Sequence, residues 1–420
     1  MATRVSSATQ IFPLANKRGA HTVVATQRRM AGRCGMVGFA RGVVMRLALL
    51  ISIAPTPSAG AMAKATDPNE NFSYYSRLFL SCRDTCNIEG CAHVTHKGAP
   101  FTTGGCIPAC ARDGSMLGPG EFPPEFTLAM RLTGWDCASD CKYRCMRTIV
   151  RVRAVEGLNT AKYYGKWSFE RVLGVQEIVS CVASLANAAV HVWFLPELWR
   201  ASSARPEALT KKNAGATSVF PRRLSASLWF ASGVVQTHGW LWSAVFHARD
   251  TPWTHAMDYG AANAIFFFAA FAATARVFAV AEARRLAIAF ACFAACFAAH
   301  LRYVNRKQQD GTKYHFQHNM AVMVGAAVFH WCLMLRWAFF GKREGKRPGR
   351  KYLAACCLVW SACALAELMD FPPVYGLLDA HALWHCGTPA TVWMWYQFAR
   401  RDAGLAAPKP EPRDAEKKSR

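Results

Sequence analysis

Two histidines, four residues apart, open the last apolar segment of the chain. In the stretch LLDAHALWH, His381 and His385 are one helical turn apart. In a helix both imidazoles would lie on one face, about 6 Å apart along the axis. This spacing is typical of a metal-binding pair, and the alternative is two packed histidines with ordinary hydrogen bonds. A metal site therefore needs further ligands from other segments.

Two other segments supply such residues. WSAVFHARD contains Ser243 and His247, again four apart, and HAMDYG contains Asp258. Three neutral imidazoles form a common zinc set, with a fourth position left for water whose pKa the metal lowers towards ~7. Asp258 would orient an imidazole or accept the proton of the water, and Ser243 would donate to the developing oxyanion. The alternatives are a helix N-cap for Asp258 and hydrogen bonding of Ser243 to a carbonyl one turn earlier.

The elements that must position these residues are apolar. The chain has 420 residues and is 52% hydrophobic, yet its net charge is +24. A membrane protein with basic loops reconciles the two properties, so we expect no nucleic-acid partner. Segments of about 20 apolar residues cross ~30 Å of hydrocarbon. Seven are predicted as spans, at residues 169–195, 224–247, 259–279, 286–301, 320–340, 352–366 and 377–399.

The amino-terminal 63 residues read as a basic extension followed by a signal peptide. No Asp or Glu occurs before residue 67, which suits a transit peptide or, as we prefer, a later true start. Met45 and a following Arg precede LALLISIA and PTPSAGAMA, which predicts cleavage near Ala61 or Ala63. Residues 64–165 would then be lumenal, in agreement with the glycosylation sequon at Asn71.

This lumenal segment is rich in cysteine. Disulfides are the expected state of an even number of cysteines in an oxidising compartment, and zinc binding is the alternative. The eight residues are Cys82, Cys86, Cys91, Cys106, Cys110, Cys137, Cys141 and Cys145. The predicted fold class is therefore an all-α membrane protein, a seven-helix bundle preceded by a Cys-rich, disulfide-bonded lumenal domain.

Basic residues predict the orientation of the bundle. They concentrate in residues 200–223, in GKREGKRPGRK at 341–351 and in the tail at 401–420, which the positive-inside rule places in the cytosol. Ser243, Asp258 and the three histidines then share the lumenal leaflet. Lys417 and Lys418 resemble a dilysine retrieval signal read by a vesicle coat, which predicts residence in the endoplasmic reticulum or Golgi membrane. The alternative is a solvated basic tail.

Several ordered motifs resemble the GPI-anchor lipid-remodelling family, the Per1-like post-GPI-attachment-to-proteins factors. They are YYGKWSFERVLGVQE, WSAVFHARD, MDY, ELMDFPP and LLDAHALWH, and the resemblance covers roughly residues 72–400. The family is similar to alkaline ceramidases and adiponectin-type receptors, with seven helices and a Ser, Asp, three-His set. The resemblance implies those roles for Ser243, Asp258, His247, His381 and His385. It also implies supporting polar roles for Glu177, Ser184 and Asn187.

The resemblance further implies an activity for residues 166–400, a seven-transmembrane hydrolase domain. That activity is zinc-dependent removal of the sn-2 acyl chain from the phosphatidylinositol of GPI-anchored proteins, a phospholipase A2 type of ester hydrolysis. One alternative is a ceramidase-like amide hydrolase, and another is a non-catalytic receptor or sorting factor for GPI-anchored proteins. Oligomeric state, acyl-chain preference and disulfide connectivity are not predicted.

Overall fold

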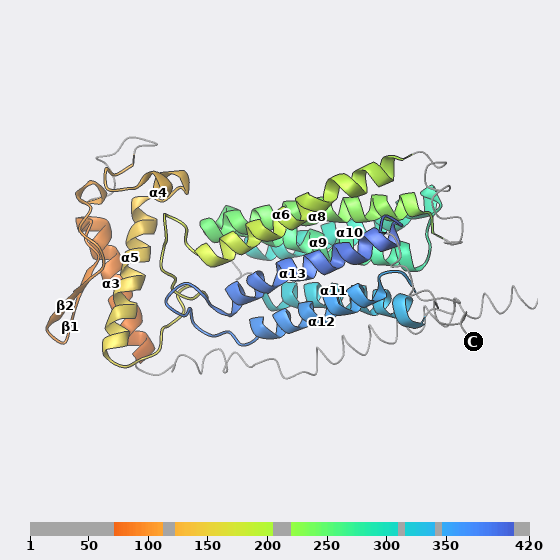
Figure 1. Cartoon of the computed structure of the whole chain (residues 1–420). Helices are drawn as coiled ribbons and strands as arrows, with labels where there is room; N and C mark the ends of the chain where they lie inside the picture. The colour runs from red at the N-terminus through yellow and green to blue at the C-terminus, as the bar shows by residue number, and fades with distance from the viewer. Residues whose placement is uncertain (1–70, 112–121, 205–219, 310–315, 341–346, 407–420) are drawn as a thin grey trace, which may run out of the picture. The chain divides into compact units, whose positions relative to one another are not determined.

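A computed structural model describes residues 71–111, 122–204, 220–309, 316–340 and 347–406 of the chain. The predicted signal peptide and the lysines at 417 and 418 lie outside these described residues. Six elements lie in the described residues up to 155 (Figure 1). They are α3 (Asn71–Glu89), β1 (His93–His96), β2 (Ala99–Thr102), the 3-10 helix η1 (Pro108–Cys110), α4 (Leu128–Leu132) and α5 (Cys137–Val155). The sequon residue Asn71 is the first residue of α3.

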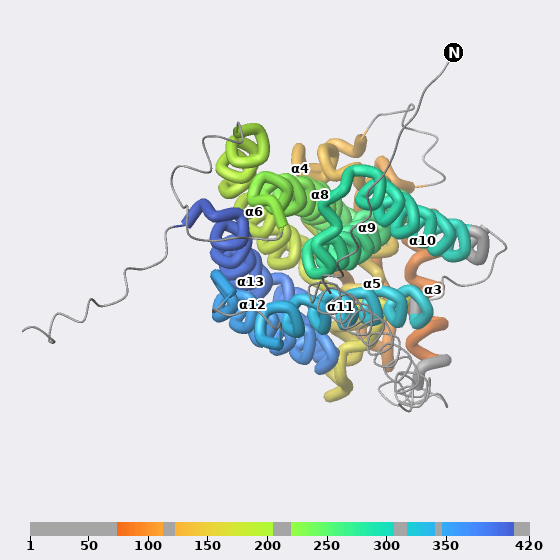
Figure 2. Tube along the Cα trace, turned by 90° about the vertical axis from the view of Figure 1, so that its right-hand side faces the viewer, coloured from red at the N-terminus to blue at the C-terminus, as the bar shows by residue number. Residues whose placement is uncertain are grey.

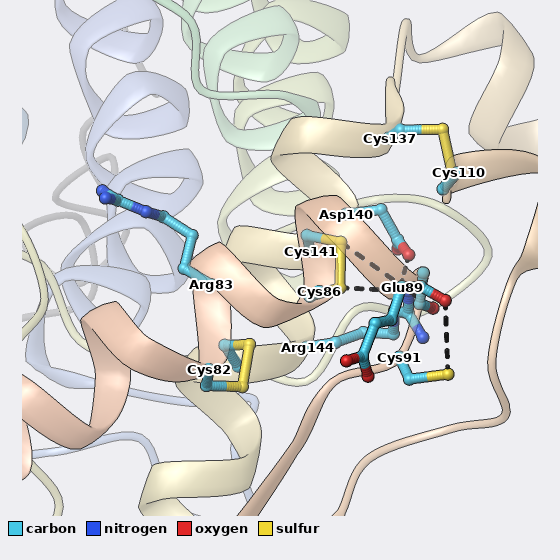
Figure 3. The surroundings of a disulfide bond; sticks show 12 residues. Cys82, Arg83, Cys86, Glu89, Cys91, Cys110, Cys137, Asp140, Cys141 and Arg144 are labelled. Atoms are coloured by element: carbon cyan, nitrogen blue, oxygen red, sulfur yellow. Dashed lines mark hydrogen bonds and ion pairs between the residues drawn. A yellow bond between two sulfur atoms is a disulfide. The ribbon is translucent and has the colours of Figure 1, made fainter. Parts of the chain in front are cut away.

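Disulfides join α3 to α5. Cys82 bonds to Cys145 and Cys86 to Cys141. Each helix contributes two cysteines four residues apart, so each pair lies on one helical face and the two faces meet. Two further bridges hold the segment between the helices: Cys91–Cys106, and Cys110–Cys137, which Figure 3 shows. The prediction of disulfides is confirmed, and the zinc alternative is wrong because all eight sulfurs are bonded to one another.

The hairpin and the connecting loop are also held by a buried arginine. Arg144 on α5 donates to the carbonyl oxygens of Gly90 and Gly105, at 3.1 and 2.6 Å. Its Nε lies 2.7 Å from Asp140, which also receives Arg171 at 2.7 Å. Charge-assisted bonds to carbonyls satisfy backbone groups that no regular element pairs.

Seven long helices follow in the described part of the chain after residue 177 (Figures 1 and 2). They are α6 (Ile178–Ser203), α8 (Arg222–Ala248), α9 (Pro252–Val277), α10 (Ala283–Gln309), α11 (Phe316–Phe340), α12 (Arg350–Glu367) and α13 (Ala380–Asp402). Within the described residues, α6, α9, α10 and α11 are long and apolar enough to cross a membrane. The other three correspond to predicted spans but do not reach that apolar content.

The helices pack as a ring in the order α6, α8, α9, α11, α12, α13, and α13 closes it against α6. Helix α10 packs mainly on α9, outside the ring (Figure 2). The first and the last helix of the bundle are therefore neighbours, although about 200 residues separate their contacting side chains.

Two helices begin several residues away from the start of the predicted span. The first helix begins at Ile178 rather than at 169, because residues 168–177 form a turn with a bridge between Val172 and Val175. Helix α9 begins at Pro252, not 259, because Thr251 and Thr254 form a capping box. Hydropathy indicates which residues of a helix are apolar enough to lie in a membrane, whereas capping residues determine where the helix begins.

The ring has a large apolar core that includes Trp229, Met334 and Phe398, each 1% exposed or less. One buried ion pair accompanies this core. Arg276, at the end of α9, donates through Nε and Nη2 to Asp402, at the end of α13. The indole of Trp229 donates to the same carboxylate at 3.0 Å. These contacts hold α8, α9 and α13 together, at the end of the bundle opposite to His247, His381 and His385.

Candidate metal centre

Three histidines meet where α8 ends and α13 begins. His247 is the penultimate residue of α8, and His381 and His385 lie in the first two turns of α13. One ligand nitrogen of each residue lies within 4.8 Å of the others. The ring centroid of His385 is 4.7 Å from that of His247 and 4.5 Å from that of His381. His247 and His385 are buried, whereas His381 is partly exposed.

Each imidazole is held through its Nδ1 atom by a different partner. His247 Nδ1 lies 2.7 Å from a Glu177 carboxylate oxygen, and His381 Nδ1 lies 3.0 Å from Glu367. His385 Nδ1 lies 3.1 Å from the Ser184 hydroxyl. Since carboxylates accept, the first two rings carry their protons on Nδ1. A histidine fixed in this way presents Nε2 to a metal.

The serine contact fixes the tautomer of the third ring. Ser184 donates its only hydroxyl proton to the Ser180 carbonyl, at 2.8 Å. It must therefore accept from His385 Nδ1, which leaves a lone pair on His385 Nε2. That nitrogen lies 2.9 Å from His381 Nε2. A proton on His381 Nε2 would make this contact a hydrogen bond to His385, and a metal ion would instead take the lone pairs of both nitrogens. Three imidazoles whose ligand nitrogens lie this close together are a common donor set for zinc, so the residues fit that metal.

The centre draws on further helices. Glu177 is the N-cap residue of α6 and Glu367 is the last residue of α12. The backbone N–H of Glu177 donates to the His247 carbonyl at 2.9 Å, which ties the start of α6 to the end of α8. Glu367 was not predicted as a site residue. One sequence feature could have identified it: Glu367 is an acidic residue at the end of an apolar helix, where a charge without a partner is energetically costly.

Ser243 faces the centre but its hydroxyl is engaged. Its Oγ lies 3.1 Å from Ser184 Oγ, which already gives its own proton to Ser180. Ser243 is thus the donor of this pair, rather than the donor to a carbonyl one turn earlier that was its alternative. To donate to an oxyanion, its hydroxyl must rotate away from Ser184.

Asp258 lies in the second turn of α9. The N-cap alternative is wrong, because Thr251 caps this helix. The Asp258 carboxylate is close enough to His247 and His381 to interact with both electrostatically. No hydrogen bond joins it to another residue in the described part of the chain, so it is available to a ligand.

The remaining polar prediction has a positioning role. Asn187, one turn beyond Ser184, donates to Thr388 Oγ1 at 2.9 Å and to the His385 carbonyl at 3.4 Å. These bonds set the depth of α13 against α6. His255, in the first turn of α9, stacks on Tyr259 with ring centroids 4.2 Å apart.

Fold and site together define a helical protein with membrane-length apolar segments and a three-histidine site shared by α8 and α13. Residues 127–403 match the model of the Per1-like family, and the chain belongs to that family. The GPI-specific phospholipase A2-like PGAP3 of Xenopus tropicalis is 33% identical over 305 residues, 71% of this chain and 87% of that protein. The protein of the same name from Danio rerio is 30% identical, covering 71% and 86%. Post-GPI attachment to proteins factor 3 of Drosophila melanogaster is 29% identical, covering 64% and 74%. No solved structure matches the chain.

Proposed function

We propose that this protein is a lipid-remodelling hydrolase that removes the sn-2 acyl chain from the phosphatidylinositol of GPI-anchored proteins. The observation that carries the proposal is the set of three imidazoles, each oriented by its own acceptor with Nε2 facing a common point. The names of the relatives, GPI-specific phospholipase A2-like and post-GPI attachment factor, support the choice of substrate.

A zinc ion held by His247, His381 and His385 would supply Lewis acidity and lower the pKa of a water molecule at the open position. In the hydrolysis, the water oxygen bonds to the acyl carbonyl carbon, and the bond from that carbon to the glycerol oxygen breaks. The products are a free fatty acid and a lysolipid that keeps the hydroxyl.

The residues of this chain would move the protons of that reaction. Asp258, whose carboxylate is free of hydrogen bonds within the described residues, accepts the proton of the water and returns it to the departing glycerol oxygen. Ser243 turns from Ser184 to donate to the carbonyl oxygen as negative charge develops there. Ser184 keeps His385 in the Nδ1-protonated form throughout.

The proposed place of action is the lumenal leaflet of the endoplasmic reticulum or Golgi membrane. A disulfide-rich amino-terminal region agrees with a lumenal location, because such bridges persist in oxidising compartments. In this orientation the histidine end of the bundle faces the lumen and the tail after residue 400 faces the cytosol.

The test is the lipid composition of GPI-anchored proteins, measured by mass spectrometry in cells that lack the protein. Re-expression of the wild type should restore removal of the sn-2 acyl chain, and re-expression of His385→Ala should not. Cys386→Ser is the matched control, since Cys386 is an exposed neighbour on the same turn of α13. Restoration by His385→Ala would leave a receptor or sorting factor as the better explanation. A change in ceramides with unaltered GPI lipids would favour the amide hydrolase.

A further inference from the structure

Two lysines of the KYYGKW segment, residues 162–167 before α6, are each paired with an aspartate from a different loop. Lys162 lies 2.6 Å from Asp370, which follows α12. Lys166 lies 2.6 Å from Asp250, which follows α8. The two pairs are alike in chemistry but differ in their surroundings.

Only Lys166 adjoins the metal centre. Its ammonium lies 3.9 Å from the centre of the Phe246 ring, and that ring lies 5.1 Å from the imidazole of His247. The charge of Lys166 also acts on Glu177 and on Asp258. Lys162 instead lies 4.8 Å above the ring of Trp167.

Other cations lie near Lys166, beside the carboxylate of Asp250. The ammonium of Lys142 lies 3.9 Å above the Tyr164 ring, and no carboxylate lies within ion-pair distance of it among the described residues. Loss of surrounding water lowers the pKa of Lys142, and Arg249, Lys166 and Arg83 lower it further by repulsion, while Asp250 opposes them. A region in which cations repel one another attracts an anionic ligand.

We propose that Lys166 binds the phosphodiester of the glycerophospholipid substrate. The inference rests on the proposed function. In such a lipid the phosphate is attached to the glycerol carbon next to the one that carries the sn-2 ester. A group that binds the phosphate must therefore lie beside the hydrolytic centre without being part of it, as Lys166 does.

The ion pair with Asp250 is compatible with this role. The two side chains are 34% and 26% exposed, so a phosphate can reach the ammonium from solvent or from the membrane surface. A lysine ammonium has three donors on a flexible stem, and phosphate is one of its common ligands. A pair this exposed contributes little to stability, so its substitution should leave the fold intact.

The experiment measures fatty-acid release from a detergent-solubilised GPI-anchored protein by the full-length chain. Dioctanoyl phosphatidylinositol, dioctanoylglycerol and inorganic phosphate serve as separate competitors. For Lys166→Gln we expect about tenfold weaker competition by the phosphatidylinositol, the loss of one charge-assisted contact, and unchanged competition by the uncharged diacylglycerol. Lys166→Arg should recover most of the loss.

Two further variants separate binding from structure. Asp250→Asn breaks the same ion pair but keeps the ammonium, so competition by the phosphatidylinositol should remain or improve. Lys162→Gln, which breaks the equivalent pair with Asp370, should behave as the wild type. Equal losses in Lys166→Gln and Asp250→Asn would overturn the inference, because the pair would then act only as a structural contact.

The source of the phosphate is tested in the same assay. Inorganic phosphate as potent as the phosphatidylinositol would assign the site to free phosphate and overturn the inference. Equal release by the wild type and His385→Ala would instead overturn the proposed function, whatever Lys166 does. The two failures are therefore distinguishable.

Discussion

At the residue scale, the three imidazoles differ in the charge and the solvent exposure of the residue that contacts each Nδ1 atom. The Glu177–His247 contact is almost fully buried, with side chains 8% and 2% exposed. The Glu367–His381 contact is open, at 37% and 38%. His385 is held by a neutral hydroxyl. Of the three candidate ligands, His247 and His385 are well protected and His381 is accessible, so a metal ion bound at the proposed site would be approached from the His381 side.

The first prediction concerns metal content. Purified protein should hold about one zinc ion, and His247→Ala, His381→Ala and His385→Ala should each lose it, because two ligands bind far more weakly than three. Metal analysis after dialysis measures this, with Cys386→Ser as the control. Full occupancy in all three variants would show that the centre is not the metal site.

The second prediction concerns the supporting carboxylates. Glu367→Gln and Glu177→Gln should each weaken zinc binding about 10- to 100-fold, since the uncharged amide makes the attached imidazole a poorer ligand. The effect should be larger for Glu177, which water screens less. Titration with a competing chelator gives both affinities. Equal affinities for wild type and Glu367→Gln would mean that the Glu367 contact only orients the ring.

At the element scale, helix ends build the site. The starts of α6, α9 and α13 and the ends of α8 and α12 all carry its residues. The opposite end of the bundle carries the Arg276–Asp402 pair, with Arg276 7% and Asp402 7% exposed. The guanidinium also lies over the rings of Trp337 and Phe220, at 4.5 and 5.1 Å. The ends of α9 and α13 are thus held together away from the chemistry.

The third prediction tests this buried pair. Asp402→Asn should destabilise the protein by about 3–5 kcal/mol, because it leaves a buried guanidinium without its counter-charge. Glu282→Gln is the matched control: it breaks the Arg285–Glu282 pair, whose side chains are 75% and 55% exposed. Its expected effect is below about 1 kcal/mol. Thermal unfolding in detergent compares the two, and similar midpoints would contradict the prediction.

The fourth prediction concerns the helix pair α3 and α5. Thiol labelling of the folded, unreduced protein should modify none of the eight amino-terminal cysteines, whereas the exposed Cys386, in the second turn of α13, should react. Peptide mapping distinguishes the two groups within one sample. Labelling at Cys82 or Cys145 would contradict the bridge that joins the helices.

The sequence was most informative where spacing decides geometry. Pairs four residues apart, such as His381 and His385 or Cys141 and Cys145, share a helical face whatever surrounds them. The pairing of Cys82 with Cys145 and the contact of Glu367 with His381 could not be predicted, because they depend on how distant helices dock. Helix starts were mistaken by several residues at 169 and 259, since hydropathy does not register turns and caps.

At the scale of the whole molecule, the apolar helices and the basic segments together indicate a membrane protein with basic loops. The chain carries 50 Lys and Arg against 26 Asp and Glu. The predicted orientation places this excess mainly in the cytosol, where anionic lipid attracts it. The lumenal side would keep the disulfides and the histidine centre.

The fifth prediction concerns the address of the molecule. Replacing Lys417 and Lys418 by Ser should move the protein to later Golgi or the cell surface without changing its activity on lipid, since a retrieval signal acts through the cytosolic tail alone. Immunofluorescence against compartment markers provides the measurement. If the double variant stays where the wild type resides, retention comes from the helices or the amino-terminal region.

The closing of the ring by α13 has a consequence for biosynthesis. Ribosomes make the chain from its amino terminus, so Glu177, Ser184 and His247 are translated well before His381 and His385. The bridges between α3 and α5 can form while the bundle is still being synthesised, but the proposed metal centre could not form until the last helix has been made. A newly made chain should therefore acquire its ion after translation ends. A chain that stops before residue 380 should form its disulfides normally and remain without activity.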